Sequence, residues 1–198
     1  MVQNLGGVVI ESINEASSAT HVIGGDDSNP FRRTPKLMVA LCSTSNILHL
    51  DWLIASKRQN RFLETRPYLL LRDRLGEKNY QFNMKETLQN GKMRREEGGI
   101  LSGWRIYVAK NVAGNKAPKQ EDLNVIITSA GGDFLDELNS EIDLSNVIVI
   151  TSDPDTLPDH VEDQLAEDHV NDAAEVFPTT WLFDVILHQK LSGLKRGR

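Results

Sequence analysis

The residues of this sequence best suited to chemistry are Arg33, Thr34 and Lys36, which stand with Pro35 directly before the apolar run 37–41. Thr34 is a favoured N-cap residue, and Pro35 suits the first helical position because its φ is already fixed. The free N–H groups of such a helix start attract an anion, to which Lys36 can add an ammonium charge. The planar fork of Arg33 suits a carboxylate or backbone carbonyls. The pattern indicates a phosphate site, and an ordinary capped helix with a solvated basic start is the alternative interpretation.

A second segment, between residues 153 and 168, is acidic where the first is basic. An anion there would meet like charge, so phosphate is expected at the first segment alone. The better interpretation of the acidic segment is a solvated helix face. Its charged residues are Asp153, Asp155, Asp159, Glu162, Asp163, Glu167 and Asp168.

Patterns typical of enzymes and metal sites are missing from the sequence. Neither a dinucleotide-binding glycine pattern nor a phosphate-loop Gly-Lys-Ser/Thr follows the apparent strand before Gly24. Cys42 and Ser129 lack a nucleophile context, and Cys42 is expected to fill the core. The histidines, which fit no usual metal spacing, are His21, His49, His160, His169 and His188. We therefore expect a binding protein without metal or other cofactor, and a small α/β hydrolase or nucleotide-binding enzyme is the remaining alternative.

The composition is that of a protein with buried cores, since 39% of the 198 residues are hydrophobic and 25% are charged. No apolar run approaches the roughly 18 residues that a membrane helix needs, and no signal peptide pattern opens the chain. The single cysteine fits a reducing, intracellular compartment. The net charge of -6 argues against broad nonspecific binding to DNA.

An internal repeat organises the chain. The glycine pairs at 6–7 and 131–132 are each followed by apolar runs and then by a tryptophan, Trp52 in the first copy and Trp181 in the second. The second glycine and the tryptophan are 45 residues apart in the first copy and 49 in the second. The same order at similar spacing predicts a duplicated module. Both tryptophans are predicted to be core anchors rather than stacking platforms for bases.

Within each copy, short continuous apolar runs alternate with helical segments, which predicts a small parallel sheet with helices on its faces. In the first copy the expected strands are 8–10, 20–23 and 47–50. The second copy is expected to contain a strand at 104–108, a helix at 121–130, strands at 134–135 and 147–150, a helical segment at 157–170, a strand at 176–177 and a helix at 180–191.

A polar stretch from residue 73 to residue 99 joins the two copies. Asn83 can cap a helix there, and Glu86 stands three residues on, as in a capping box. Met84 and Leu88 would then face the same side of the helix. The stretch is therefore predicted to hold a linker helix.

The glycine pairs, apolar runs and tryptophans together resemble the BRCT repeat, and the two copies resemble a tandem BRCT pair. The resemblance covers nearly the whole chain and is clearest in Arg32–Lys36, Ile47–Leu53, Glu77–Phe82 and Ile106–Val108. It implies an α/β fold of two repeats, each a small parallel four-stranded sheet flanked by helices. The corresponding boundaries are 1–75 for the first repeat, 76–98 for a linker with a helix and 99–198 for the second repeat.

In that family a first strand and a helix precede the glycine pair, and the strand ends in a hydroxyl residue and a glycine that complete the phosphate pocket. Only residues 1–5 precede the pair here, so the first repeat is expected to lack its first strand and most of its first helix. Loss of an internal strand exposes backbone groups and apolar flanks on both sides.

The resemblance also implies a function. In its phosphopeptide-binding members, a lysine at the place of Lys36 contacts the phosphate, with Thr34 beside it, and an arginine at the place of Arg33 contacts the peptide main chain or its terminal carboxylate. The implied ligand is a phosphoserine near the C-terminus of a variant core histone, read by a nuclear scaffold in the DNA damage response. A docking or dimerisation module of the same fold that does not read phosphate is the alternative. Neither implies sequence-specific contact with DNA or with a membrane.

Overall fold

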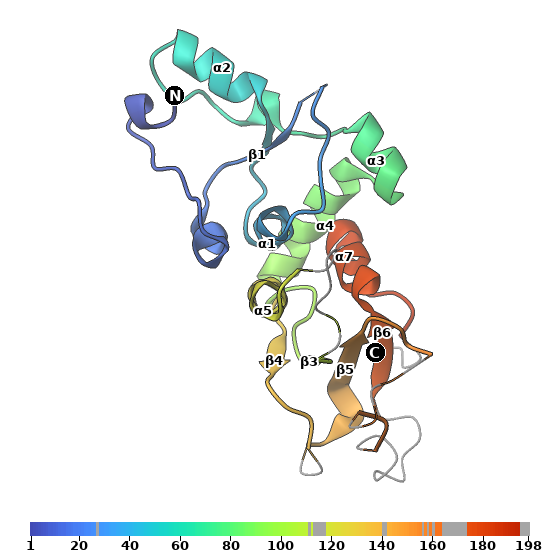
Figure 1. Ribbon diagram of the computed structural model, residues 1–198. Helices are drawn as coiled ribbons and strands as arrows, with labels where there is room; N and C mark the ends of the chain where they lie inside the picture. Colours follow the sequence, from blue (N-terminus) through green and yellow to red (C-terminus); the bar gives the residue numbers. More distant parts are fainter. Residues whose placement is uncertain are drawn as a thin grey trace.

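The first half of the chain builds a two-stranded parallel sheet with helices around it (Figure 1). The computed structural model describes residues 1–26, 28–110, 112, 118–139, 142–155, 157, 159, 161–163 and 174–194. The sheet pairs Val22 with Ile47 and Ile23 with Leu48. The elements of this half are η1 (Gln3–Leu5), η2 (Ile13–Ser18), β1 (Val22–Gly25), α1 (Pro35–Ser43), β2 (Ile47–His49), α2 (Asp51–Arg58) and η3 (Arg66–Tyr68).

The second half contains a four-stranded parallel sheet in the order β4-β3-β5-β6. Every residue of β5 is buried, as expected for a central parallel strand covered on both faces. Two helices, α3 (Arg74–Tyr80) and α4 (Met84–Glu96), connect the halves. The elements that follow are β3 (Arg105–Val108), α5 (Gln120–Ser129), β4 (Asp133–Leu135), η4 (Leu144–Asn146), β5 (Val147–Thr151), β6 (Glu175–Pro178) and α7 (Thr179–His188).

A layer of four helices holds the halves together. Helix α1 from the first half packs against α4, α5 and α7, and the buried side chains of both halves form one continuous cluster (Figure 1). Polar contacts reinforce the layer, because Thr87 Oγ1 donates to the Leu187 carbonyl and Arg95 Nη1 donates to the Leu41 carbonyl at 3.2 Å. The start of α1 is therefore fixed relative to the second half.

Most of the predicted elements are confirmed. Asn83 caps α4 by accepting a hydrogen bond from the Glu86 N–H at 3.0 Å. The two tryptophans are buried and repeat one contact, since Trp52 Nε1 donates to the carbonyl 11 residues on at 2.9 Å and Trp181 Nε1 does the same at 2.8 Å. This shared contact supports the duplicated module. Most of the segment 157–170, with His160 and His169, lies outside the described residues.

The predicted strand at 8–10 is wrong. These residues form no ladder, and Val8 and Val9 are 87% and 50% exposed. An apolar run becomes a strand only when another strand lies beside it, and no strand among the described residues lies beside 8–10. The other differences are at the ends of elements: β1 extends to Gly25, and α7 ends at His188 rather than at 191.

Among the described residues, none of the helices is both long and apolar enough to cross a membrane. The same part of the chain holds no group of three or more His, Cys, Asp or Glu side chains placed to bind a metal ion.

The buried thiol of Cys42 should make stability depend on pH above neutrality. Burial raises its pKa from 9.0 to about 12. The thiol then stays neutral in the folded chain while it ionises in the unfolded chain, so its contribution is complete below pH 9 and is lost between pH 9 and pH 12. We expect the free energy of unfolding to fall by about 1 kcal/mol between pH 9 and pH 10 through this group. Urea titrations at each pH would measure the free energy of unfolding of the parent chain and of Cys42→Ala. An equal fall with pH in both proteins would contradict the expectation.

Candidate phosphate-binding site

The candidate phosphate site lies at the first turn of α1. Thr34 is extended (φ −87°, ψ 149°), and its Oγ1 accepts a hydrogen bond from the Leu37 N–H at 3.4 Å, which confirms the predicted cap. Pro35 stands in the first turn and has no N–H to offer. The amide left for a ligand is therefore that of Lys36, because the first N–H groups of a helix have no partner inside it and the Leu37 N–H is used by the cap. Thr34 and Lys36 are both exposed, so the hydroxyl and the ammonium are within reach of a ligand.

Two hollows flank this turn, and they differ in charge. The smaller, of about 320 Å³, is lined by Thr34 and Arg32 but also by Asp26, whose carboxylate opposes the charge of Arg32. Hydrogen bonds from the Asn29 side chain and amide and from the Ser28 amide lower the pKa of Asp26, so its carboxylate is ionised at neutral pH. The larger, of about 730 Å³, is lined by both Thr34 and Lys36 and by no carboxylate. An anion therefore fits better on the Lys36 side of the turn.

Arg33 lies at the junction of the two halves. Its Nη1 donates to Asp184 Oδ1 on α7 at 3.1 Å, and its guanidinium carbon lies 4.6 Å from the ring centroid of Tyr80 and 5.9 Å from that of Phe183. The hydrogen bond and the two aromatic rings hold the planar guanidinium in one orientation, as is common where an arginine stacks on aromatic rings. The side chain is 29% exposed, and donors not used by Asp184 remain for a carboxylate or a carbonyl oxygen.

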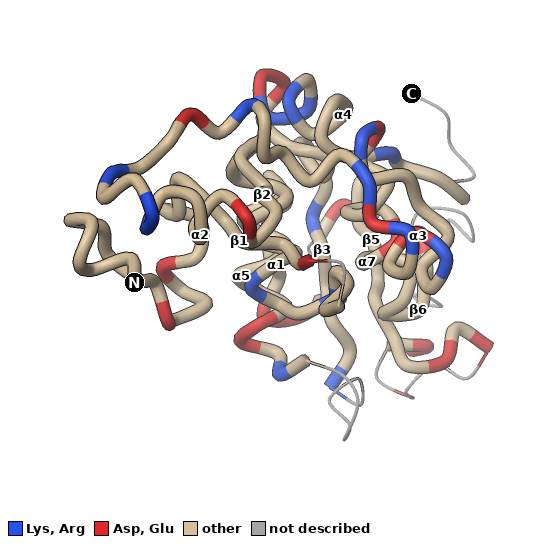
Figure 2. Tube along the Cα trace, turned by 90° about the horizontal axis from the view of Figure 1, so that it is seen from above, with Lys and Arg blue, Asp and Glu red and all other residues tan. Residues whose placement is uncertain are grey.

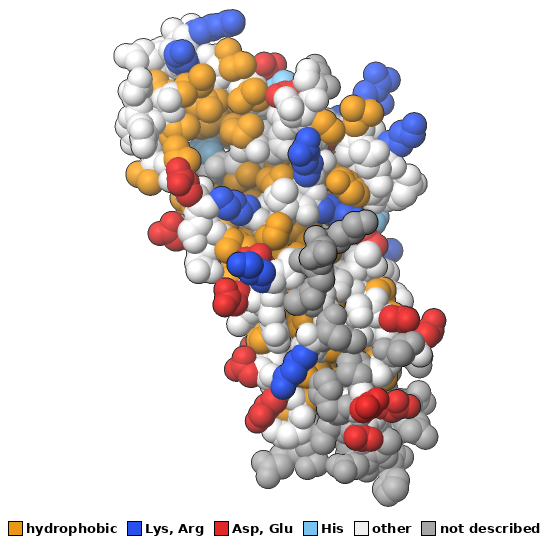
Figure 3. Space-filling model, in the orientation of Figure 1, with side chains coloured by type: hydrophobic (Ala, Val, Ile, Leu, Met, Phe, Trp, Pro, Cys, Tyr) orange, Lys and Arg blue, Asp and Glu red, His pale blue; other side chains and the backbone are white. Residues whose placement is uncertain are grey.

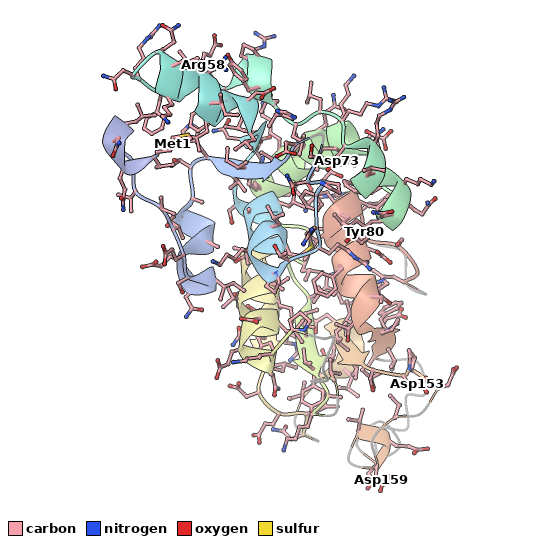
Figure 4. The ribbon with its side chains drawn as sticks, turned by 45° about the horizontal axis from the view of Figure 1, so that its top comes forward. Met1, Arg58, Asp73, Tyr80, Asp153 and Asp159 are labelled. Carbon is pink, nitrogen blue, oxygen red and sulfur yellow. The ribbon has the colours of Figure 1, made fainter. Side chains whose placement is uncertain are left out.

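Sequence reasoning named Arg33 but missed the residues that hold it. Asp184 is the one charged residue in the apolar run 181–187, and that interruption is the available signal. Tyr80 ends α3 in a polar segment, and nothing in the sequence around it indicates a contact with Arg33. Figure 4 shows Tyr80 where α3 approaches α7. His188 ties these helices together, with Nδ1 2.7 Å from the Asp184 carbonyl oxygen and Nε2 3.0 Å from the Gln81 carbonyl oxygen.

Charge is divided unevenly between the two halves (Figure 2). Residues 1–98 contain 14 Lys and Arg against 11 Asp and Glu, whereas residues 99–198 contain 8 against 17. Figure 4 shows Asp153 and Asp159 at the end of the molecule away from Arg58. The exposed acidic residues of this segment are Asp153, Asp155, Asp159, Glu162 and Asp163, while Glu167 and Asp168 lie outside the described residues. The acidic half is a poor place for an anion, which leaves the start of α1 as the candidate.

Comparisons with known proteins agree with this architecture. The family model described as "BRCT domain" matches residues 99–196. The mediator of DNA damage checkpoint protein 1 of Mus musculus is 32% identical over 145 residues, which are 73% of this chain and 8% of that protein. The Homo sapiens protein of the same name is 31% identical over 145 residues, or 6% of its length. The chain thus spans less than a tenth of either relative.

A solved structure extends the likeness to the whole chain. The crystal structure of the S. pombe Brc1 BRCT5-BRCT6 domains matches with a TM-score of 0.71, over 96% of this chain and 86% of that one. The sequences are 18% identical, so this match bears on the fold alone. Since a BRCT domain occupies residues 99–196 and the tandem BRCT fold covers nearly the whole chain, this protein belongs to the BRCT family.

Proposed function

We propose that this chain is a phosphopeptide-binding scaffold module of the DNA damage response. The observation that carries the proposal is the division of charge around one helix turn. Lys36 and Thr34 offer an ammonium and a hydroxyl on the side that has no carboxylate, and Arg33 holds a guanidinium at the junction of the halves. The similarity to the mediator of DNA damage checkpoint protein 1 supports a role in the DNA damage response. The proposed activity is binding, without catalysis.

The ligand we propose is a phosphoserine close to a free C-terminus, as in the tail of a variant core histone. A dianionic phosphoryl group has acceptor oxygens for the ammonium, the hydroxyl and the Lys36 N–H at once. The fork of Arg33 would take the terminal carboxylate or a main-chain carbonyl of the downstream residues. Such a module would act in the nucleus. We place its first repeat at 1–75, its linker at 76–98 and its second repeat at 99–198.

Paired peptides test the proposal directly. One peptide carries a phosphoserine near a free C-terminus, and its twin carries serine. Each charge-assisted hydrogen bond to the phosphate should contribute roughly 1.5–3 kcal/mol, or about ten- to a hundredfold apiece, so the phosphorylated peptide should bind at least about tenfold tighter. Isothermal titration calorimetry on the whole chain would measure both affinities.

Equal affinity for the two peptides would contradict phosphate reading. It would favour the alternative, a docking or dimerisation module of the same fold. The observation that supports this alternative is the exposure of large apolar side chains in the first half, among them Val8, Val9 and Phe62. Sedimentation of the chain at increasing concentration would show whether those side chains bring two copies together.

A further inference from the structure

Residues 57–78 form a basic rim along one edge of the first half. This stretch contains 7 Lys and Arg against 3 Asp and Glu, a net charge of +4 in a chain whose net charge is -6. It runs from the end of α2 through η3 into α3. All of its cationic side chains are exposed. The residues that define the basic rim are Lys57, Arg58, Arg61, Arg66, Arg72, Arg74 and Lys78.

Nothing in the described part of the fold engages the cations of the basic rim. None of the seven side chains forms an ion pair or donates a hydrogen bond to another described residue. Arginines that serve the fold do have such partners: Arg95 Nη1 donates to the Leu41 carbonyl at 3.2 Å, and Arg105 Nε donates to Asn146 Oδ1 at 3.0 Å. The charge of the basic rim is therefore available to a partner.

Three of the rim cations, Arg72, Arg74 and Lys78, line one hollow of about 780 Å³. Asp26 and Asp73 line it too, but both carboxylates already accept hydrogen bonds from backbone amides of the chain. The three cations of the hollow have no such partners. They are open to an anionic ligand, and the excess of positive charge continues along the rim to α2.

Opposite charges gather at opposite ends of the molecule. In Figure 3, Lys and Arg side chains project from the upper edge, over α2 and α3, and most of the visible Asp and Glu side chains lie below them. Figure 4 shows Arg58 and Asp73 along this upper edge and Asp153 and Asp159 at the far end. A polyanion would be attracted to the basic rim and repelled by the second half, so the negative net charge does not oppose a local contact.

We infer that the basic rim binds the phosphate backbone of a nucleic acid duplex without reading its sequence. Each strand of a duplex presents a phosphate about every 3.4 Å, a regular row of charge that suits cations spread along an edge. An extended acidic polypeptide offers a charge on one side only about every 7 Å, because its side chains alternate in direction. Five of the seven cations are arginines, whose planar guanidinium forms paired hydrogen bonds with phosphate oxygens. This inference does not rest on the phosphopeptide function.

The test is the fluorescence anisotropy of labelled DNA and RNA duplexes of about 20 base pairs, titrated with the whole chain between about 50 and 200 mM salt. For one duplex or both, we expect the logarithm of the association constant to fall against that of the salt concentration with a slope of about −3.6 or steeper, which corresponds to four or more phosphate contacts. Duplexes of unrelated sequence should bind alike. A shallower slope for both nucleic acids would overturn the inference. Polyglutamate that competes as well as a duplex of equal charge would assign the rim to an acidic protein and would overturn it too.

Two matched double variants locate the contact. Lys57→Gln with Lys78→Gln removes a cation at each end of the stretch, and it should flatten the slope by about 1.8 and weaken duplex binding at least about tenfold. Lys110→Gln with Lys119→Gln removes two exposed lysines of the second half, changes the net charge equally and should bind the duplex as the parent does. Equal duplex affinities for the two double variants would reject the basic rim as the site.

The same variants separate this inference from the phosphopeptide function. Neither Lys57 nor Lys78 lines the two hollows beside Thr34. The affinity of their double variant for the phosphoserine peptide should therefore equal that of the parent, whether the parent binds the peptide or not. A loss of peptide binding equal to the loss of duplex binding would place both ligands on one site and would overturn the inference.

Discussion

Lys36→Met should weaken binding of the phosphoserine peptide by roughly ten- to a hundredfold while leaving the unphosphorylated peptide unaffected. The loss corresponds to one charge-assisted hydrogen bond of about 1.5–3 kcal/mol. Methionine keeps the length of the side chain and has a helix propensity similar to that of lysine. Because Lys36 is exposed, the free energy of unfolding should change by no more than about 0.5 kcal/mol. Calorimetric titration with both peptides gives the two affinities.

Lys92→Met is the matched control, because Lys92 is also an exposed lysine on a helix, α4. It should bind both peptides as the parent does. Arg33→Ala should weaken both peptides by a similar factor, because its guanidinium would contact the carboxylate or main chain rather than the phosphate. If Lys36→Met and Lys92→Met bind the phosphorylated peptide alike, the start of α1 serves only to cap its helix.

Gly131→Ala should cost at least about 4 kcal/mol of unfolding free energy, a loss large enough to unfold a marginally stable domain. Gly131 has a positive φ of +85°, and a Cβ there would lie 2.0 Å from the carbonyl oxygen of Gly98. The backbone fixes the position of the Cβ, and the oxygen is itself a backbone atom, so no side-chain rotation relieves the clash. The end of α5 would have to move away from the chain that leaves α4. Urea denaturation followed by circular dichroism would measure the loss.

Gly6→Ala separates the strain of a positive φ from the clash of the added Cβ. Gly6 has nearly the same φ, +81°, but a Cβ there meets nothing within 4 Å. Its substitution should therefore cost only the strain of a left-handed backbone, about 1–2 kcal/mol. Similar losses for Gly6→Ala and Gly131→Ala would show that the contact between Gly131 and Gly98 relaxes easily.

The parts of the fold that could be predicted are those governed by local chemistry. Thr34 and Asn83 cap their helices as expected, because an N-cap depends on a side chain and an amide two or three residues apart. The described strands and helices of the second half follow the predicted order because its apolar runs are continuous. The run at 8–10 looked equally apolar but forms no strand, since pairing depends on a neighbour that local sequence does not specify.

The candidate site could be predicted only in part, for the same reason. Residues 33–36 are contiguous, so their types alone indicate an anion site at a helix start. The partners of Arg33 come from distant parts of the chain, and Asp184 stands 151 residues away. Neither Tyr80 nor Phe183 lies in a pattern that indicates contact with an arginine. Only the packing of α1 against α7 brings these groups together.

Because of the position of Arg33, the affinity for the ligand depends on parts of the protein that the ligand does not contact. Arg33 belongs to the first half of the chain, yet its guanidinium is held by α7 of the second half. A peptide that needs both Lys36 and Arg33 binds only molecules whose halves are docked, and its apparent affinity falls in proportion to the docked fraction. The linkage is reciprocal, since ligand at a hundred times its dissociation constant adds about 2.7 kcal/mol to the docked state. The peptide would act as a removable clasp between the two halves.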